Sequence, residues 1–186
     1  IQVRDNGSGI HPDDLCLALS RHATSKISSS DQLSQISSLG FRGEALPSIS
    51  SVSNLSLISR QHDSECGWQI HFETDMPEPV PHPKGTTVAV RDLFFNLPAR
   101  RRFLRSARTE QQQILTTLQR LALSQFDVRF QCNLNGQQKL NLPIAQTDAQ
   151  QLARIGKICG QTFVKQALVI DQQFDVINIK GWLGHT

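Results

Sequence analysis

Two glycine-containing motifs constrain the fold of this chain most strongly, because each stands where one regular element ends and another begins. The first, Asp5 to Ile10 (Asp-Asn-Gly-Ser-Gly-Ile), follows a strand-like segment, Ile1 to Arg4. The second, Gly40 to Leu46 (Gly-Phe-Arg-Gly-Glu-Ala-Leu), precedes an expected helix. Helix N-termini carry unpaired N–H groups and a positive dipole end, which favour phosphate. Together the motifs predict two sides of a nucleotide pocket.

The first motif suits a base rather than a phosphate. The Asp5 carboxylate is an acceptor that fits an exocyclic amine such as that of adenine. Gly7 and Gly9 let a flat ring approach the backbone without a side chain in the way. Taken alone, however, this pattern favours an ordinary tight turn between a strand and a helix.

The second motif suits phosphate, to which Arg42 and Lys26 would add positive charge. Taken alone, it is evenly balanced between a phosphate site and a helix-capping turn. Thr87 follows Gly85 at the start of a strand, where its hydroxyl can reach a base edge directly or through water. Taken alone, that threonine is better interpreted as a strand former.

Composition sets wide limits on function. The 186 residues are 38% hydrophobic, enough for one domain and the start of another, and the net charge of +3 is too small to identify a nucleic-acid binder. Four scattered cysteines form no C-x-x-C pair, so the sequence predicts reduced thiols in a cytoplasmic protein. It shows neither a signal peptide nor a membrane-spanning run.

Alternating apolar residues predict strands, including a hairpin around Asn135-Gly136. The expected strands span residues 1–4, 52–59, 68–72, 88–90, 128–142 (the hairpin), 164–170 and 176–183. Expected helices begin at Pro12, near Glu44, at Pro98 (a basic stretch to Ser106), at Thr109 and at Thr147, the last ending near Gly160. The serine-rich residues 23–39 predict a long functional loop, and a composition change near Thr147 predicts a domain boundary.

The two motifs and the segment Gly85 to Thr87, taken in this order, resemble the ATP-binding fold of gyrase, heat-shock chaperones, histidine kinases and MutL proteins (the GHKL class). Gly40 to Leu46, Arg21 to Lys26 and Asp92 to Leu104 resemble the MutL family of mismatch-repair proteins specifically, and the resemblance covers Ile1 to about Ile158. It implies an α+β fold, an α/β sandwich with a mixed, mostly antiparallel sheet. The expected domains are 1–147, the GHKL ATPase domain, and 148–186, the start of a ribosomal-S5-like domain.

The resemblance implies an ATP site with adenine on the Asp5 side and phosphates wrapped by the second motif. The implied ATP-binding residues are Asp5, Gly7, Gly9, Thr24, Ser25, Lys26, Gly40, Phe41, Arg42, Gly43, Glu44 and Thr87. The family's catalytic glutamate and magnesium-binding asparagine belong to a helix before Ile1. Because the chain starts in a strand and ends after one, we expect a fragment cut at both ends, with no catalytic or metal-binding residue of its own.

The resemblance also implies partners. In the intact protein, ATP and magnesium would order the loop and favour a homodimer, coupling recognition of mismatched DNA by MutS to a downstream endonuclease or helicase. The implied DNA-binding residues are Arg100, Arg101, Arg102, Arg105 and Arg108. Arg101, Arg105 and Arg108 share a face if their helix is unbroken, although a solvated helix face is an equal alternative. Phe103 and Leu104 are expected in the core.

Two alternatives remain from the sequence. The chain is either part of a slow ATPase that acts as a switch or an incomplete nucleotide-binding module without catalysis. A gyrase-like or kinase-like relative is disfavoured by the sequence of the loop.

Overall fold

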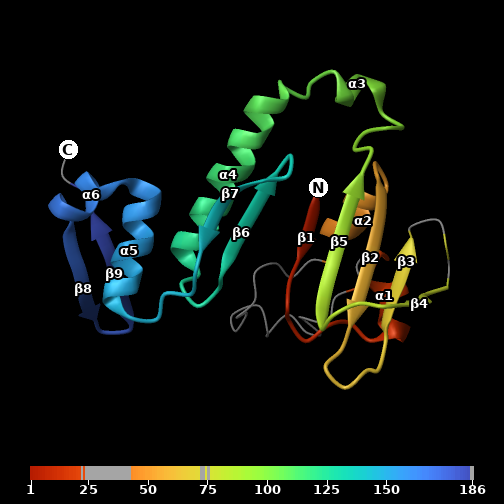
Figure 1. The fold of residues 1–186 in the computed structure, drawn as a ribbon, viewed down its shortest axis with the longest axis horizontal. Helices are drawn as coiled ribbons and strands as arrows, with labels where there is room; N and C mark the ends of the chain where they lie inside the picture. Colours follow the sequence, from red (N-terminus) through yellow and green to blue (C-terminus); the bar gives the residue numbers. More distant parts are fainter. Residues whose placement is uncertain (22, 24–42, 72–73, 75, 185–186) are drawn as a thin grey trace. The chain divides into compact units, whose positions relative to one another are not determined.

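The computed structural model describes residues 1–21, 23, 43–71, 74 and 76–184 (Figure 1). The chain forms two compact units, Ile1–Leu104 and a second unit that begins at Arg105. Each unit is described below by itself. The predicted domain boundary at Thr147 stays a prediction.

The first unit is built on one sheet in which every neighbouring pair of strands is antiparallel. Its strands in spatial order are β1 (Gln2–Arg4), β5 (Gly85–Arg91), β2 (Asn54–Arg60), β3 (Gly67–His71) and β4 (Glu78–Val80). Val3 lies opposite Val88, and Val88 lies opposite Leu57. Because residues that face each other across a ladder share a side of the sheet, these three define one apolar face.

Two helices, α1 (Pro12–Ala18) and α2 (Ala45–Ser50), pack on that apolar face (Figure 1). The core consists of Leu15 from α1 and Leu55, Leu57 and Ile70 from the sheet, each at most 3% exposed. Burying a leucine side chain contributes about 1.5–3 kcal/mol. The α+β class and the predicted early strands and helices are therefore confirmed.

The proline-rich connection contains an unpredicted strand. Glu78 lies opposite Gln69 and Val80 opposite Gly67, so β4 forms the edge of the sheet beyond β3. Pro79 stands in the middle of β4. Proline has no N–H to donate and is therefore confined in sheets to edges, where the missing donor can face away from the ladder.

The second unit alternates helices with two hairpins. Its elements are α4 (Ala107–Ser124), β6 (Phe130–Leu134), β7 (Gln137–Leu142), α5 (Asp148–Cys159), α6 (Gln161–Gln166), β8 (Leu168–Phe174) and β9 (Ile177–Leu183). The Asn135-Gly136 hairpin is confirmed, and both residues have the positive φ (52° and 76°) that a type I′ turn requires. The capping box of Thr147 and Gln150 is also confirmed.

Two sequence-based boundaries were wrong for local reasons. The strand expected from Val164 begins at Leu168, because Gly160 (φ 94°) ends α5 and a short helix, α6, follows it. The helix expected from Thr109 begins at Ala107, because the Ser106 hydroxyl accepts a hydrogen bond from the Thr109 N–H.

The basic stretch is not one helix. α3 covers only Pro98–Arg101, and α4 starts after the Ser106 cap. Arg101 therefore belongs to a different helix from Arg108, and the condition for a shared arginine face is not met.

A buried arginine holds the second unit together. Arg154, on α5, is 2% exposed. Its guanidinium donates to the carbonyl oxygens of Ala122 (3.0 Å), Gln125 (2.9 Å), Val128 (2.9 Å) and Pro143. These carbonyls belong to the end of α4, the loop after it and the residue after β7. One side chain therefore supplies hydrogen-bond donors to three chain segments.

The surroundings of Arg154 fit this role. Its guanidinium lies over the Phe126 ring, 5.5 Å from the centroid, and Trp182 meets that ring edge-on at 5.9 Å. Burial lowers the pKa of Arg154 and nearby Asp127 opposes the shift. Arginine is the cation that tolerates such a site, because its pKa starts far above neutral pH.

We expect Arg154→Lys to destabilise the second unit by about 3 kcal/mol, because an ammonium cannot reproduce the planar fork that reaches four carbonyls. The measurement is urea unfolding followed by Trp182 fluorescence in a Trp68→Phe background. Arg129→Lys is the matched control, since Arg129 is exposed and, within the described part of the chain, donates one hydrogen bond, to Asn141 (3.4 Å). Equal midpoints for the two variants would contradict the role of Arg154.

Candidate functional site

The Asp5 carboxylate is fixed at the junction of β1 and β5. Its Oδ1 accepts hydrogen bonds from the Gly7 N–H (2.8 Å) and the Thr86 N–H (3.2 Å). The Asp5 N–H donates to the Thr86 carbonyl at 2.9 Å. Among the described residues no donor reaches Oδ2. A carboxylate held by one oxygen and open at the other suits a ligand amine.

Two glycines allow the backbones around Asp5 to approach one another. Gly85 has φ 108°, and a Cβ there would lie 2.1 Å from the Asp5 carbonyl oxygen. Gly9 has φ 78°, and its Cβ would lie 2.3 Å from the Arg60 carbonyl oxygen. Both distances are impossible for a side chain, so glycine is needed here for contact between chain segments. For Gly9 this reason is independent of any ring approaching it.

A buried hydroxyl pair connects the first motif to the sheet. Ser59 is fully buried, and its Oγ accepts from the Ile10 N–H at 2.8 Å. The same Oγ lies 2.9 Å from the Thr86 Oγ1. The loop from Asp5 to Ile10 is thus fixed at one end by Thr86 and at the other by Ser59.

Thr86, and not Thr87, shares a side of the sheet with this cluster. Thr86 faces Ser59 across the β2–β5 ladder, on the side that the helices cover. The next residue, Thr87, points to the opposite side, where its hydroxyl pairs with the His82 Nε2 at 2.8 Å. The structure therefore does not bring the Thr87 side chain to Asp5. Sequence analysis could have favoured Thr86 over Thr87 only by predicting that Thr86 lies opposite Ser59 in the sheet.

The second motif is described only in part. Gly43 has φ 61°, and a Cβ there would lie 2.1 Å from the Ala23 carbonyl oxygen. Glu44 is the N-cap residue of α2, as predicted. The remaining predicted residues of this side lie outside the described residues: Thr24, Ser25, Lys26, Gly40, Phe41 and Arg42. The described contact here is therefore between Gly43 and Ala23, the residue that precedes Thr24 in the sequence.

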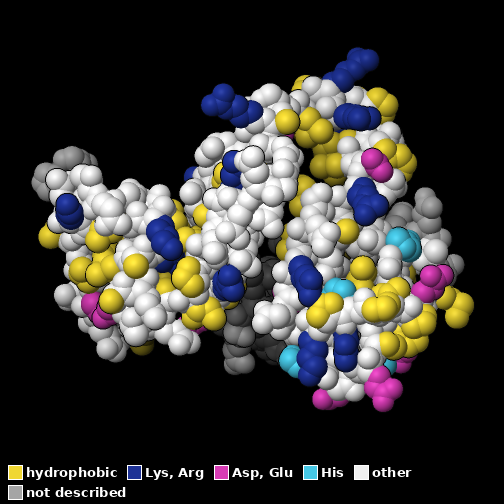
Figure 2. All heavy atoms as spheres, viewed as in Figure 1, with side chains coloured by type: hydrophobic (Ala, Val, Ile, Leu, Met, Phe, Trp, Pro, Cys, Tyr) yellow, Lys and Arg dark blue, Asp and Glu magenta, His cyan; other side chains and the backbone are white. Residues whose placement is uncertain are grey.

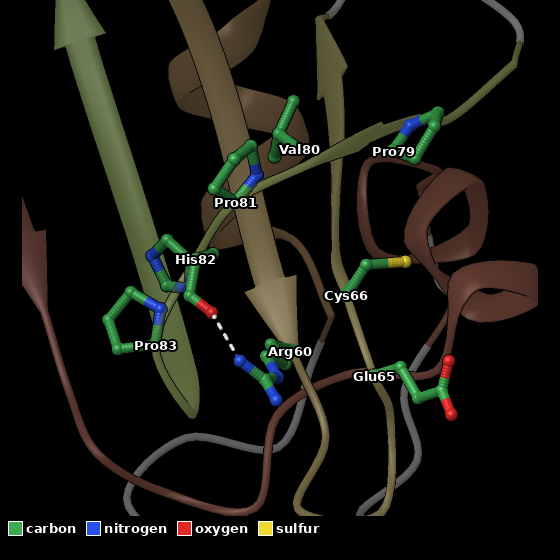
Figure 3. Close-up of a pocket in the computed structure, with 8 residues that line it drawn as sticks. All are labelled: Arg60, Glu65, Cys66, Pro79, Val80, Pro81, His82 and Pro83. Atoms are coloured by element: carbon green, nitrogen blue, oxygen red, sulfur yellow. Dashed lines mark hydrogen bonds between the residues drawn. The ribbon is translucent and has the colours of Figure 1, made fainter.

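A cavity of about 630 Å³ opens elsewhere in the first unit (Figure 3). It is lined by Arg60, Glu65, Cys66, Pro79, Val80, Pro81, His82 and Pro83. The Arg60 Nη1 donates to the His82 carbonyl at 3.2 Å. Figure 3 shows the Cys66 and His82 side chains pointing away from each other. The cavity does not include Asp5, and the described residues contain no group of three metal-ligating side chains.

The basic residues are divided between the units. Arg100, Arg101 and Arg102 are exposed in the first unit, whereas Arg105 and Arg108 are exposed in the second. The expectation that Phe103 and Leu104 lie in the core was wrong, since they are 85% and 42% exposed. α3 ends at Arg101, so no continuous helix carries these two side chains to a buried face.

No described helix combines the length and apolarity that a membrane crossing demands.

No family model matches the chain, but similar sequences were found among MutL proteins. The chain is 50% identical over 188 residues to the DNA mismatch repair protein MutL of Pseudomonas fluorescens, covering 99% of this chain and 30% of that protein. Identity is 49% to MutL of Pseudomonas entomophila and 48% to MutL of Cellvibrio japonicus, with 99% and 98% of this chain covered and 30% of each relative. The chain therefore spans about a third of the length of these relatives.

Solved structures agree with the sequences. The Aquifex aeolicus MutL ATPase domain complexed with ADP is 33% identical, with a TM-score of 0.64 over 86% of this chain and 56% of that one. A second structure of the ATPase domain from Aquifex aeolicus MutL is 27% identical, with a TM-score of 0.63 over 100% of this chain and 61% of that one. The described sheet and helices therefore have the GHKL type of fold.

Proposed function

Because this chain belongs to the MutL family of DNA mismatch repair proteins, we propose that its first unit binds the adenine of ATP through Asp5. The observation that carries this proposal is the half-satisfied carboxylate. Oδ1 is held by two backbone N–H groups, while no described donor reaches Oδ2. Adenine presents an amine donor where guanine presents a carbonyl acceptor. A carboxylate fixed opposite that position of the ring therefore favours adenine over guanine.

In this proposal, Thr86 is a second residue beside the base. Its hydroxyl stands next to Ser59 on the same side of the sheet, and its N–H already donates to Asp5. The family resemblance assigned this role to Thr87, whose hydroxyl is 2.8 Å from His82 on the other side. We therefore assign the hydroxyl beside the base to Thr86.

The phosphate side follows from the family. In this proposal Thr24, Ser25 and Lys26 and the segment from Gly40 to Glu44 bind the phosphates, with magnesium in the intact protein. The contact between Gly43 and Ala23, which directly precedes Thr24 in the sequence, supports it. The structure with ADP shows that a MutL ATPase domain from Aquifex aeolicus binds nucleotide.

We propose that the intact protein uses slow ATP hydrolysis as a switch. ATP binding would favour a homodimer and couple recognition of mismatched DNA by MutS to a downstream endonuclease or helicase in the cytoplasm. The arginines from Arg100 to Arg108 would contact the DNA. The alternative is that the 186 residues by themselves form a nucleotide-binding module without catalysis.

We expect Asp5→Asn to weaken ADP binding by about 10- to 100-fold, because a hydrogen bond to a charged acceptor contributes about 1.5–3 kcal/mol. Isothermal titration of the 186-residue chain with ADP and GDP measures this. Asp13→Asn is the matched control, since Asp13 is an exposed carboxylate in the first turn of α1. Unchanged affinity and unchanged preference for adenine in Asp5→Asn would refute the proposed base site.

A pair of variants separates the two threonines. We expect Thr86→Val to weaken ADP binding by about 3- to 10-fold, the cost of about one neutral hydrogen bond. Thr87→Val should leave ADP affinity unchanged and lower the unfolding midpoint instead, because it removes the partner of the His82 ring. The reverse pattern in the same titrations would return the role to Thr87.

We expect the 186 residues alone to show no ATP turnover above background. Phosphate release with magnesium and ATP is the measurement, and the control is Asp5→Asn at the same concentration. Turnover that Asp5→Asn abolishes would show that the general base lies within this chain.

A further inference from the structure

The cavity of the first unit combines one guanidinium with largely apolar walls, and we call it the Arg60 cavity. Its volume of about 630 Å³ falls within the range of small-molecule sites, about 300–1,000 Å³. Figure 2 shows hydrophobic side chains gathered over β4 and its connection to β5, with basic side chains next to them. Apolar walls with a few fixed polar groups are typical of ligand sites.

The Arg60 guanidinium is held in place by two carbonyl groups. Its Nε donates to the Ser64 carbonyl at 3.0 Å, and its Nη1 donates to the His82 carbonyl at 3.2 Å (Figure 3). A guanidinium carries five N–H donors, and the remaining ones have no acceptor among the described residues. No described carboxylate forms an ion pair with Arg60, and Figure 3 shows the Glu65 carboxylate directed away from it.

His82 supplies a second unused donor at the same end of the cavity. Its Nε2 lies 2.8 Å from the Thr87 Oγ1, and Thr87 is 5% exposed. Because the described residues offer the Thr87 hydroxyl no other acceptor, it donates to Nε2, and the ring proton stands on Nδ1. That nitrogen is buried and has no partner among the described residues. A buried polar atom that the chain leaves unpaired points to a partner from outside it.

The wall that carries His82 is packed directly on the sheet. A Cβ on Gly67 would lie 2.5 Å from the His82 Cβ and 3.0 Å from the Val80 carbonyl oxygen, so only glycine allows this approach. The Arg60 hydrogen bond fixes the same wall from β2. A ligand that enters such a preformed cavity needs to order few groups.

The charges of the cavity favour a single negative charge on the ligand. Among the residues that line it, Arg60 carries the one fixed positive charge, and Glu65 carries the one negative charge. A phosphate monoester brings nearly two negative charges, which one guanidinium does not balance. A carboxylate brings one, and its planar shape matches two parallel N–H groups of a guanidinium.

The walls favour an apolar stem over a peptide. Pro79, Pro81 and Pro83 line the cavity and have no N–H to donate. A peptide carries a donor and an acceptor at almost every residue, and these groups need partners when they are buried. A hydrocarbon stem needs none, and it removes the prolines and Val80 from water.

We propose that the Arg60 cavity binds a small carboxylic acid with an apolar stem. The carboxylate lies beside the unused donors of Arg60 and His82, and the stem lies against the prolines and Val80. This site is separate from the proposed nucleotide site, because the cavity does not include Asp5.

A pair of isosteric probes separates charge from apolar contact. We expect 2-naphthoate to bind about 10- to 100-fold more tightly than 2-naphthamide, because the neutral amide cannot form charge-assisted hydrogen bonds with the guanidinium. Amide-proton NMR titration of the whole chain measures both affinities. The shift changes should centre on the N–H groups of Cys66, Val80 and His82. ADP at saturating concentration should leave the affinity for the acid unchanged, so failure of the nucleotide site would not affect this test.

Variants test the guanidinium itself. Arg60→Gln should lower the affinity for 2-naphthoate to that for 2-naphthamide and leave the amide unaffected. Arg60→Lys should retain part of the difference, since it keeps the charge and loses the planar fork. Arg91→Gln is the matched control, because Arg91 is exposed at the other end of β5. Should Arg60→Gln fail to fold, the comparison of acid with amide on the unchanged chain still decides the question.

Four outcomes would overturn the proposal. The first is equal affinity for the acid and the amide, and the second is equal loss of acid binding in Arg60→Gln and Arg91→Gln. The third is a set of shift changes centred on Gly7 and Thr86, which would place the acid at the nucleotide site. The fourth is tighter binding of an acetylated Ala-Ala-Phe peptide with a free carboxylate, which would assign the cavity to a peptide C-terminus instead.

Discussion

The first unit depends on the close approach of three backbones where β1, β2 and β5 reach the same end of the sheet. The Asp5 carbonyl lies where a side chain on residue 85 would stand, and the Arg60 carbonyl lies where one on residue 9 would stand. Removing two side chains lets the strands converge until main-chain and hydroxyl groups can bond across the gap. Asp5, Ser59 and Thr86 then hold each other in place, and the carboxylate is oriented before any ligand arrives. An acceptor that is already oriented loses less conformational entropy when it forms a further hydrogen bond.

In the second unit, a side chain brings separate chain segments together. The loop after α4 and the exit from β7 leave carbonyl groups directed inward, and buried carbonyls without donors are costly. Arg154 supplies the donors from α5, and the Phe126 ring covers its guanidinium. In one unit the chain is brought together by the absence of side chains, and in the other by a single large one. Both arrangements serve the same requirement, that buried polar groups find partners.

The sequence predicted what depends on neighbours along the chain. The Asn135-Gly136 turn, the Thr147 capping box and the strand–turn–helix around Asp5 were all correct, because each is decided within a few residues. It failed where two local signals compete, as at Ser106 and Thr109, either of which can cap a helix. The sequence does not decide what depends on pairing between distant strands. Which side of the sheet Thr86 and Thr87 each face follows from the alignment of residue 59 with residue 86, and nothing near either threonine encodes it.

The prolines of β4 also decide how this sheet can meet other molecules. An extended chain directs alternate N–H groups to opposite sides, and β4 uses those of Glu78 and Val80 toward β3. Pro79, with Pro77 and Pro81 on either side of the strand, leaves the outward side without donors. A strand from another chain can therefore find no register there, and this border of the sheet resists aggregation. Among the strands that the structure describes, the other edge of the sheet is β1, which leads directly into Asp5. The two edges of this sheet therefore differ: proline removes the donors from one, and the chain of the other continues into the loop that holds the Asp5 carboxylate.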